Sequence, residues 1–343
     1  MAFHRRTGQS GLTHSARVTV LSAAAATAAA ALGAAPAVAD PQDTATSAQT
    51  RVDGLFEQAE KATEAYNKAG ERAGRLRAEV AATRDSVARG QERLNRMRGR
   101  LGAFAGAQYR SGGMDPSLAL LLSGSPDTYL DKASTIERIG DRQSGELREV
   151  QEEQRRIGQQ RLEAAAQLAD LEESRTAVAR HKRVIESKLA EARRLVNAMP
   201  AQERAAFDHA SRSSLRDELP SLSGSAPSSA RAAAAVMAAR QAVGRPYVWG
   251  ANGPSGFDCS GLMQWSYAQA GVGLPRTSQA QRYAGRQIPL SEAKPGDLVI
   301  YRDDASHVAM YMGNGQVVHA PYPGAPVRYD PVGMMPVSSV TRV

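Results

Sequence analysis

The clearest periodic pattern in the chain is a heptad repeat of small and apolar residues between Val52 and Phe104. One set of heptad positions holds Val52, Ala59, Tyr66, Ala73, Val80, Val87, Leu94 and Leu101, and the other holds Leu55, Ala62, Ala69, Leu76, Thr83, Gly90, Met97 and Phe104. Alternating spacings of four and three residues predict a long α-helix whose apolar stripe forms a coiled-coil seam. Because many of these positions are alanine, each should bury little area although the helices approach closely.

A second apolar stripe at helical spacing runs from Leu147 to Met199 in a less regular register. Its other members are Val150, Ile157, Ala164, Leu168, Leu171, Val178, Ile185, Leu189, Ala192 and Val196, and Arg161, Arg175 and Lys182 interrupt it. Pro200 should end this helix, since proline cannot continue the backbone hydrogen-bond pattern. Between the stripes, Gly- and Pro-containing segments flank the apolar run 118–122. We therefore predict an antiparallel coiled-coil hairpin over residues 40–210, whose tip run either packs on the hairpin or docks a partner.

The pattern changes after residue 230, where short apolar runs alternate with Gly- and Pro-rich turns. Residues 231–343 hold ten aromatic residues, both tryptophans among them, and are long enough for one small core. Helices are expected at 231–243, at 259–270 and after Leu274, and strands at 298–301, 307–312, 316–320 and after Arg328 and Ser338. Gly313-Asn314-Gly315 is typical of a β-hairpin turn. The predicted fold class is α+β, with helices packed on a small antiparallel sheet.

The ends of these regions define the expected domain organisation. A basic stretch, an alanine-rich apolar stretch and the sequence Ala37-Val38-Ala39 predict a signal peptide over residues 1–39, removed before Asp40. Residues 211–230 are rich in Ser, Ala and Pro and should link the hairpin flexibly to the C-terminal domain of residues 231–343. No later segment is long and apolar enough to span a bilayer, so we expect a secreted protein located at the cell wall.

The charge of the chain limits its partners. The formal net charge is +8, and removal of the three arginines of the signal peptide leaves about +5. This mild excess fits an anionic envelope surface. It is too weak and too dispersed to indicate a nucleic-acid partner.

Cys259 is the only cysteine in the chain, so no intramolecular disulfide can form. An unpaired thiol is a liability in an oxidising compartment, which favours a chemical role over that of a small buried hydrophobe. Asp258 is placed to cap a helix that begins at Cys259, and the positive end of that helix should lower the pKa of the thiol. The backbone N–H of Cys259 could also stabilise an oxyanion.

Two downstream histidines supply the other parts of a thiol-nucleophile site. His307 begins one predicted strand and His319 lies on its hairpin partner, so the two rings can be neighbours. A base and an orienting group are what a thiol nucleophile needs. The same three residues could bind zinc, but they supply only three ligands without a paired-ligand motif, so no metal or other cofactor is expected.

Four motifs in order carry a resemblance to a known family. They are Tyr247-Val248-Trp249-Gly250, Asp258-Cys259-Ser260-Gly261-Leu262, Pro295-Gly296-Asp297-Leu298 and His307-Val308-Ala309-Met310-Tyr311. Together they resemble the NlpC/P60 family of cell-wall peptidases, over residues 231–343. The resemblance implies a papain-like fold and cleavage of peptidoglycan stem peptides, most often between D-isoglutamate and the diamino acid at position 3.

The same resemblance assigns roles to individual residues. It implies that Cys259 is the nucleophile, His307 the general base and His319 the orienting third residue. It also implies substrate contacts, which the residues alone leave open against capping, packing or surface roles: Tyr247, Asp258, Ser260, Arg276 and Ser278.

The order of hairpin, linker and peptidase resembles that of secreted actinobacterial hydrolases of this family. By analogy with related envelope hydrolases, the hairpin would dock onto a membrane-bound regulator or cover the active site. Two alternatives stay open. One is a non-enzymatic envelope adaptor, whose hairpin binds a partner and whose C-terminal domain binds wall peptides; the other is acyl transfer to an amine on the same fold. The presence of the thiol and both histidines favours the enzyme.

Overall fold

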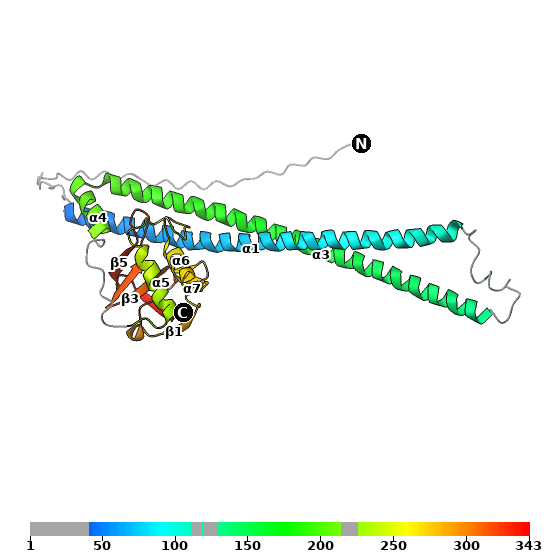
Figure 1. Cartoon of the computed structure of the whole chain (residues 1–343). Helices are drawn as coiled ribbons and strands as arrows, with labels where there is room; N and C mark the ends of the chain where they lie inside the picture. The colour runs from blue at the N-terminus through cyan, green and yellow to red at the C-terminus, as the bar shows by residue number, and fades with distance from the viewer. Residues whose placement is uncertain (1–40, 111–117, 119–128, 214–225) are drawn as a thin grey trace, which may run out of the picture. The chain divides into compact units, whose positions relative to one another are not determined.

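The computed structural model describes residues 41–110, 118, 129–213 and 226–343. The expected signal peptide lies outside these residues, as do most of the expected linker and all of the apolar tip run except Leu118, which is exposed. The helices before the C-terminal domain are α1 (Pro41–Arg110), α3 (Tyr129–Ala198) and α4 (Ala201–Ser213) (Figure 1). Over the described residues, none of the helices combines the length and the apolar character that a membrane span requires.

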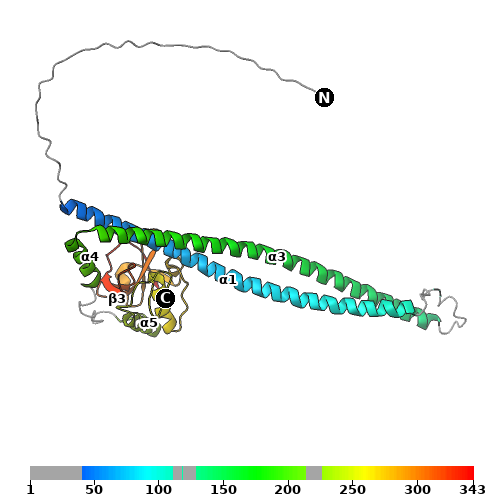
Figure 2. The same ribbon diagram turned by 90° about the horizontal axis from the view of Figure 1, so that it is seen from above.

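Helices α1 and α3 form a long antiparallel hairpin, as the sequence predicts (Figure 2). Thr83 and Ser86 of α1 hydrogen-bond to Gln167 and Gln160 of α3, at 3.1 and 2.9 Å respectively. The residue number rises from 83 to 86 in α1 while that of its partner falls from 167 to 160 in α3, so the two helices run antiparallel. Pro200 follows the end of α3, which agrees with its predicted role as a helix stop.

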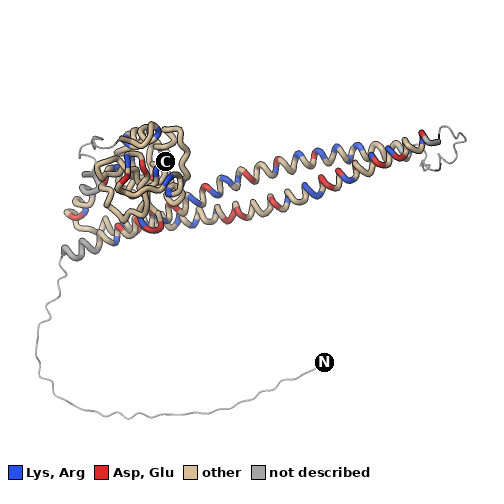
Figure 3. The backbone as a smooth tube through the Cα atoms, turned by 90° about the horizontal axis from the view of Figure 1, so that it is seen from below, with Lys and Arg blue, Asp and Glu red and all other residues tan. Residues whose placement is uncertain are grey.

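The heptad stripe is the buried face of α1. Nine of its members are buried, namely Val52, Leu55, Ala59, Ala62, Ala73, Leu76, Val80, Gly90 and Leu94. A Cβ atom on Gly90 would lie 2.9 Å from Glu153 Oε1 and 3.0 Å from Ile157 Cγ1, so a heptad glycine marks a close approach of the two helices. Lys and Arg are interspersed with Asp and Glu along both helices (Figure 3). The stripe ends before Phe104, which is exposed.

One stretch of α1 departs from this pattern. Glu60, Thr63, Glu64 and Asn67 are buried, although the heptad places them outside the apolar stripe. Buried carboxylates need partners, because desolvating an unpaired charge is costly. Their partners belong to the C-terminal domain.

The C-terminal domain joins three helices to a six-stranded antiparallel sheet. The helices are α5 (Ala230–Gln241), α6 (Cys259–Gln269) and α7 (Ser278–Gln281), with a short 3-10 turn η2 (Leu290–Glu292). The strands are β1 (Arg286–Ile288), β2 (Leu298–Tyr301), β3 (His307–Gly313), β4 (Gln316–His319), β5 (Arg328–Pro331) and β6 (Val337–Arg342). Their order in the sheet is β1-β6-β2-β3-β4-β5. The predicted α+β fold class is confirmed, and β1 is a short strand that the sequence pattern does not reveal.

The two faces of the sheet carry alternate residues of each strand. Val308 and Met310 of β3 pack with Leu262 and Met263 of α6 in the main core. The intervening residue Ala309 faces the other side, in a smaller core with residues of β2, β4 and β6. This alternation decides which strand residues can meet at the functional site.

Candidate active site

Cys259 is held at the first residue of α6 by the predicted cap. The Asp258 side chain accepts a hydrogen bond from the Gly261 backbone N–H at 2.7 Å. Gly261 itself has no room for a side chain, since a Cβ atom there would collide with the carbonyl oxygen of Ala251. The Cys259 thiol is fully buried and accepts a hydrogen bond from the backbone N–H of Val308. Strand β3 and helix α6 thus fix the thiol together.

His307 and His319 are in direct contact, as their predicted hairpin placement allows. Nε2 of His307 lies 2.8 Å from Nδ1 of His319. His307 is fully buried and His319 is 1% exposed. Reactive atoms of Cys259 and His307 lie within 4.8 Å of each other, in a group that also includes Glu60. The three residues predicted to be catalytic are therefore brought together.

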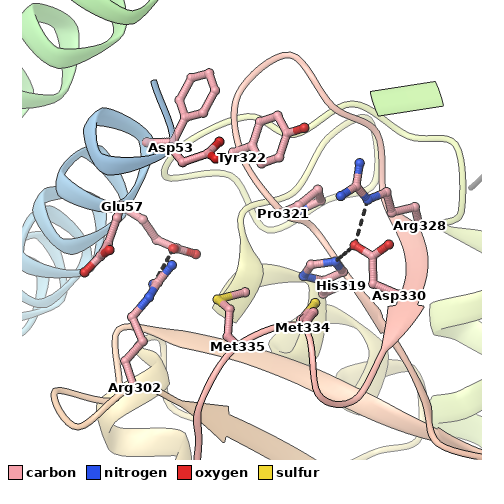
Figure 4. A pocket seen from close by; sticks show the side chains of 12 residues that line it. Asp53, Glu57, Arg302, His319, Pro321, Tyr322, Arg328, Asp330, Met334 and Met335 are labelled. Atoms are coloured by element: carbon pink, nitrogen blue, oxygen red, sulfur yellow. Dashed lines mark hydrogen bonds and ion pairs between the residues drawn. The ribbon is translucent and has the colours of Figure 1, made fainter. Parts of the chain in front are cut away.

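The histidine pair continues into strand β5, which sequence reasoning missed. Asp330 Oδ2 lies 2.8 Å from Nε2 of His319, and the same oxygen accepts a hydrogen bond from Arg328 Nε at 2.8 Å (Figure 4). Burial opposes the ionisation of Asp330, but the hydrogen bond from His319 and the charge of Arg328 outweigh it and lower the pKa of Asp330. The pair of histidine rings is therefore hydrogen-bonded, through His319, to an ionised carboxylate.

Glu60 of α1 contacts Nδ1, the second ring nitrogen of His307. Its Oε1 is hydrogen-bonded to Nδ1 of His307, and its Oε2 accepts a hydrogen bond from Arg302 at 2.7 Å. Burial opposes the ionisation of this carboxyl, yet His307 and Arg302 outweigh burial and lower the pKa of Glu60. The nitrogen that would face a thiol nucleophile is thus in contact with a carboxylate from α1.

Glu64, one helical turn further on, covers the thiol side of the site. Its Oε1 accepts a hydrogen bond from Ser260 Oγ at 2.6 Å and lies 3.6 Å from Cys259 Sγ, while its Oε2 accepts one from the Ser278 backbone N–H at 2.9 Å. Burial, followed by the charge of Asp258, raises the pKa of Glu64 to about 7. Hydrogen bonds from Ser260 and Ser278 and the charge of Arg276 oppose this rise without cancelling it.

The residues predicted to contact substrate lie around Glu64 and the Cys259 thiol. Asp258 is both the helix cap and the partner of Arg276, whose guanidinium donates to its two oxygens at 2.6 and 2.9 Å. Asn67 of α1 donates to Asp258 Oδ2 at 3.0 Å. The Ser278 hydroxyl donates instead to the backbone carbonyl of Ala305, so only its N–H faces Glu64. Tyr247 is buried, and burial followed by the charge of Cys259 raises its pKa.

The expected lowering of the Cys259 pKa is wrong for this arrangement. Burial, followed by the charges of Glu64, Glu60 and Asp258, raises the pKa of Cys259 well above its ordinary value. The hydrogen bond from the Val308 backbone N–H favours the thiolate, but desolvation and three carboxyl groups outweigh it. Two of those groups come from α1, which a local sequence pattern cannot place near the thiol.

Glu60, Cys259 and His307 are also the residue types that bind transition metals. Two ligands of one tetrahedral zinc ion lie roughly 3.3 Å apart, given metal–ligand bonds of about 2.0 Å. Glu60 and His307 are closer than this, in a direct hydrogen bond. Their geometry is that of an ion pair rather than of two metal ligands.

Two further contacts dock α1 on the domain, one from a residue before the two carboxylates and one from a residue between them. Phe56 stacks on Tyr322 with ring centroids 4.7 Å apart, and Lys61 forms an ion pair with Asp304 at 3.0 Å. A cavity of about 310 Å³ remains beside the contact and is lined by residues of both parts (Figure 4). The lining residues are Asp53, Phe56, Glu57, Glu60, Arg302, His319, Pro321, Tyr322, Arg328, Asp330, Met334 and Met335.

The fold and the site define a class: a small α+β domain with a thiol at a helix start and a histidine pair on the adjacent strands. Residues 244–340 match the NlpC/P60 family. The C-terminal part of this chain is therefore an NlpC/P60 domain.

Curated relatives of this domain carry the name endopeptidase. The chain is 47% identical over 118 residues to the peptidoglycan endopeptidase RipA of Mycolicibacterium smegmatis, covering 29% of this chain and 23% of the relative. It is 44% identical over 117 residues to a probable endopeptidase of Corynebacterium glutamicum, covering 34% and 56%. The probable endopeptidase p60 of Listeria monocytogenes is 49% identical over 94 residues, with 27% and 19% covered. The chain thus spans about half or less of the length of these relatives.

Two solved structures are similar to the same part of the chain. The NlpC/P60 domain of the peptidoglycan hydrolase SagA is 38% identical, with 33% of this chain and 98% of that chain covered and a TM-score of 0.31. The resuscitation promoting factor interacting protein RipA, mutated at E444, is 35% identical, with 33% and 61% covered and a TM-score of 0.31.

Sequence reasoning missed Glu60, Glu64, Arg302 and Asp330. A local signal existed for Asp330, because Arg328 and Asp330 alternate around an apolar tyrosine in a strand, which places both on the face that holds His319. The two glutamates look like ordinary solvent-facing residues of a heptad helix. Only the docking of α1 distinguishes them from the exposed glutamates further along.

Proposed function

We propose that this protein is a secreted peptidoglycan endopeptidase of the Cys-His-His type, made in a latent form that its own hairpin holds inactive. The observation that carries the proposal is the buried group of Cys259, His307 and Glu60, whose reactive atoms lie within 4.8 Å of one another. The first two are a nucleophile and a base, and the third is a carboxylate supplied by another part of the chain. The names of the relatives support the substrate class.

The proposed reaction is hydrolysis of a stem peptide through a thioester. His307 takes the proton of Cys259, and the thiolate attacks the scissile carbonyl carbon. The tetrahedral intermediate collapses as the amine leaves with the proton from His307, and water then hydrolyses the thioester with His307 as base. His319 holds the ring of His307 in the orientation that this proton transfer needs, through their 2.8 Å contact.

The polar residues around the thiol are proposed to bind the stem peptide. Arg276 is 13% exposed at its side chain and is fixed by Asp258, so it presents a rigid cation beside the nucleophile. Stem peptides carry carboxylates and amines next to the scissile bond, and a paired Arg and Asp can receive both kinds of charge. Tyr247, Ser260 and the Ser278 backbone complete the proposed binding set, for a cut between D-isoglutamate and the diamino acid.

Latency follows from what Glu60 and Glu64 contact. An ionised carboxylate only accepts hydrogen bonds, so Nδ1 of His307 must carry a proton while Glu60 is bound and cannot take one from the thiol. Glu64 fills the space between Ser260 and the Ser278 backbone, where a substrate would have to lie. Docked α1 thus prevents His307 from acting as a base and also blocks access of the substrate to Cys259.

Activation then requires α1 to leave the cleft. The hairpin is a long arm joined to the domain through residues 211–230, and Leu118 at its far end is exposed. We propose that a membrane-bound regulator of the envelope engages this arm and displaces α1. The site of action would be the cell wall, in remodelling or cell separation.

The test is digestion of purified peptidoglycan by the full chain and by its Glu60→Ala, Glu64→Ala double variant, with mass analysis of the released muropeptides. New fragments ending in D-isoglutamate, released faster by the double variant, are expected. Binding of wall material without any fragment from either protein would favour the non-enzymatic adaptor instead.

A further inference from the structure

Asp330, His319 and His307 form one chain of hydrogen bonds. The contact between Asp330 and His319 therefore affects which ring nitrogen of His307 carries the proton. Asp330 Oδ2 receives two donors, Arg328 Nε and His319 Nε2, each at 2.8 Å. The three side chains lie on one face of neighbouring strands, because β4 and β5 pair with His319 opposite Arg328 and Val317 opposite Asp330. Asp330 is 17% exposed at its side chain and Arg328 14%, so solvent reaches them little.

A carboxylate oxygen can only accept hydrogen bonds, so Nε2 of His319 must carry the ring proton. Burial, together with the charge of His307, outweighs the hydrogen bond to Asp330 and lowers the pKa of His319 to about 4. The ring is therefore neutral at neutral pH, and its Nδ1 is an unprotonated acceptor. The 2.8 Å contact with His307 can then form only if Nε2 of His307 donates.

This fixes where the base keeps its lone pair. While Glu60 is docked, Nδ1 of His307 carries a proton as well. Once Glu60 leaves, a neutral His307 whose proton sits on Nε2 has an unprotonated Nδ1, and Nδ1 is the nitrogen on the side of Cys259. If His319 instead carried its proton on Nδ1, it would donate to His307, and the His307 proton would move to Nδ1. That tautomer could not accept a proton from the thiol.

We propose that Asp330, held by Arg328, is a positioning residue that selects the base-competent tautomer of His307 by fixing the proton of His319 on Nε2. The proposal rests on the proposed function of the same site and extends it by one residue beyond the Cys-His-His set. Arg328 acts by keeping Oδ2 of Asp330 in place as an acceptor. It is further restrained over the ring of Tyr322, with its guanidinium carbon 5.6 Å from the ring centroid (Figure 4).

The direct test is the tautomer itself, read from long-range ¹H–¹⁵N correlations of the full chain labelled with ¹⁵N-histidine. The His319 signals are assigned by their loss in His319→Gln. The variant Asp330→Leu keeps the branched side-chain shape without an acceptor, and Asp330→Ala serves as a second variant if leucine disturbs folding. Asp330→Asn keeps an acceptor oxygen toward Arg328, and Asp303→Ala removes an exposed carboxylate between β2 and β3 as the matched control.

The wild type, Asp330→Asn and Asp303→Ala are expected to show His319 as the Nε2–H tautomer at neutral pH. Asp330→Leu or Asp330→Ala should show the Nδ1–H form or a mixture. An unchanged Nε2–H pattern in both variants that lack an acceptor would overturn the proposal. This readout needs no turnover, so it decides the inference even if wall hydrolysis is not observed.

Activity supplies the second readout, in the Glu60→Ala, Glu64→Ala background. Removal of the acceptor should lower kcat by roughly 10- to 100-fold with KM nearly unchanged. The wrong tautomer lowers the fraction of enzyme molecules whose His307 can accept the thiol proton, but it does not change substrate binding. Asp330→Asn should restore most of kcat. A shifted tautomer with an unchanged kcat would overturn the positioning role. Absence of any wall hydrolysis in the background protein would instead count against the proposed function.

Discussion

Glu60 hydrogen-bonds Nδ1 of His307, a residue 247 positions further along the chain. The contact joins the first helix of the hairpin to the histidine that we propose as the base of the site. Arg302 holds the second oxygen of the same carboxylate at 2.7 Å, so Glu60 is fixed from both sides. The proposed inactive state would therefore rest on specific charged contacts rather than on general shielding of a cleft.

Cys259→Ala is expected to reduce wall hydrolysis by at least about 10³-fold, because the nucleophile acts as a unit with its base. The thiol is buried, so the domain should lose only about 1 kcal/mol of stability on removal of one sulfur atom. The measurement is fragment release in the Glu60→Ala, Glu64→Ala background, with thermal unfolding as the fold control. Fragment release at the background rate would exclude Cys259 as the nucleophile.

The two histidines should differ in their effect. His307→Ala should cost nearly as much as the loss of Cys259, because His307 is the proposed acceptor of the thiol proton. His319→Ala should leave residual activity, roughly 10- to 100-fold below the parent, since the packing around His307 still orients its ring in part. Rates of both variants in the same background check this. An inactive His319→Ala beside an active His307→Ala would show that the roles are misassigned.

Removal of the two α1 carboxylates should activate the full chain. Each makes buried charged hydrogen bonds worth about 1.5–3 kcal/mol, so their loss should raise the rate of wall hydrolysis by roughly 10-fold or more. Glu79→Ala is the matched control, since Glu79 is an exposed glutamate further along the same helix. The rate of residues 226–343 alone gives the upper limit. Equal rates for the full chain, the double variant and this fragment would leave the hairpin as a tether.

Docking of α1 should weaken as the pH rises from about 4.5 to 7. Burial raises the pKa of Glu64 from 4.5 to about 7 in the docked state, so the docked chain binds more protons than the open chain within this window. Glu60 acts in the opposite sense, since its lowered pKa weakens docking only as the pH falls below its ordinary 4.5. Arg276 and Asp258 face Glu64 from the domain and stay paired with each other.

The measurement is the rate of the full chain divided by the rate of the double variant, which removes the pH dependence of the chemistry itself. This ratio should rise between pH 5 and about 7.5. Glu64→Gln, which cannot ionise, should flatten the rise. A flat ratio in the wild type, or the same rise in Glu64→Gln, would show that Glu64 does not control docking.

The sequence by itself determined most of the elements and the candidate reacting groups. The heptad of α1, the strands β2 to β6 and the cap at Asp258 follow from local periodicity and from short-range hydrogen bonds, which a linear pattern records. The pairing of His307 with His319 also follows, because a tight turn forces the strands on either side to be neighbours.

The tertiary structure alone decided the state of the site. Glu60 and Glu64 look like solvent-facing residues of a helix until α1 lies over Cys259, and burial then reverses the expected direction of the thiol pKa. Asp330 reaches His319 only through the pairing of β4 with β5. A pKa depends on desolvation and on charges within a few ångströms, and the groups that supply both lie far apart in the sequence.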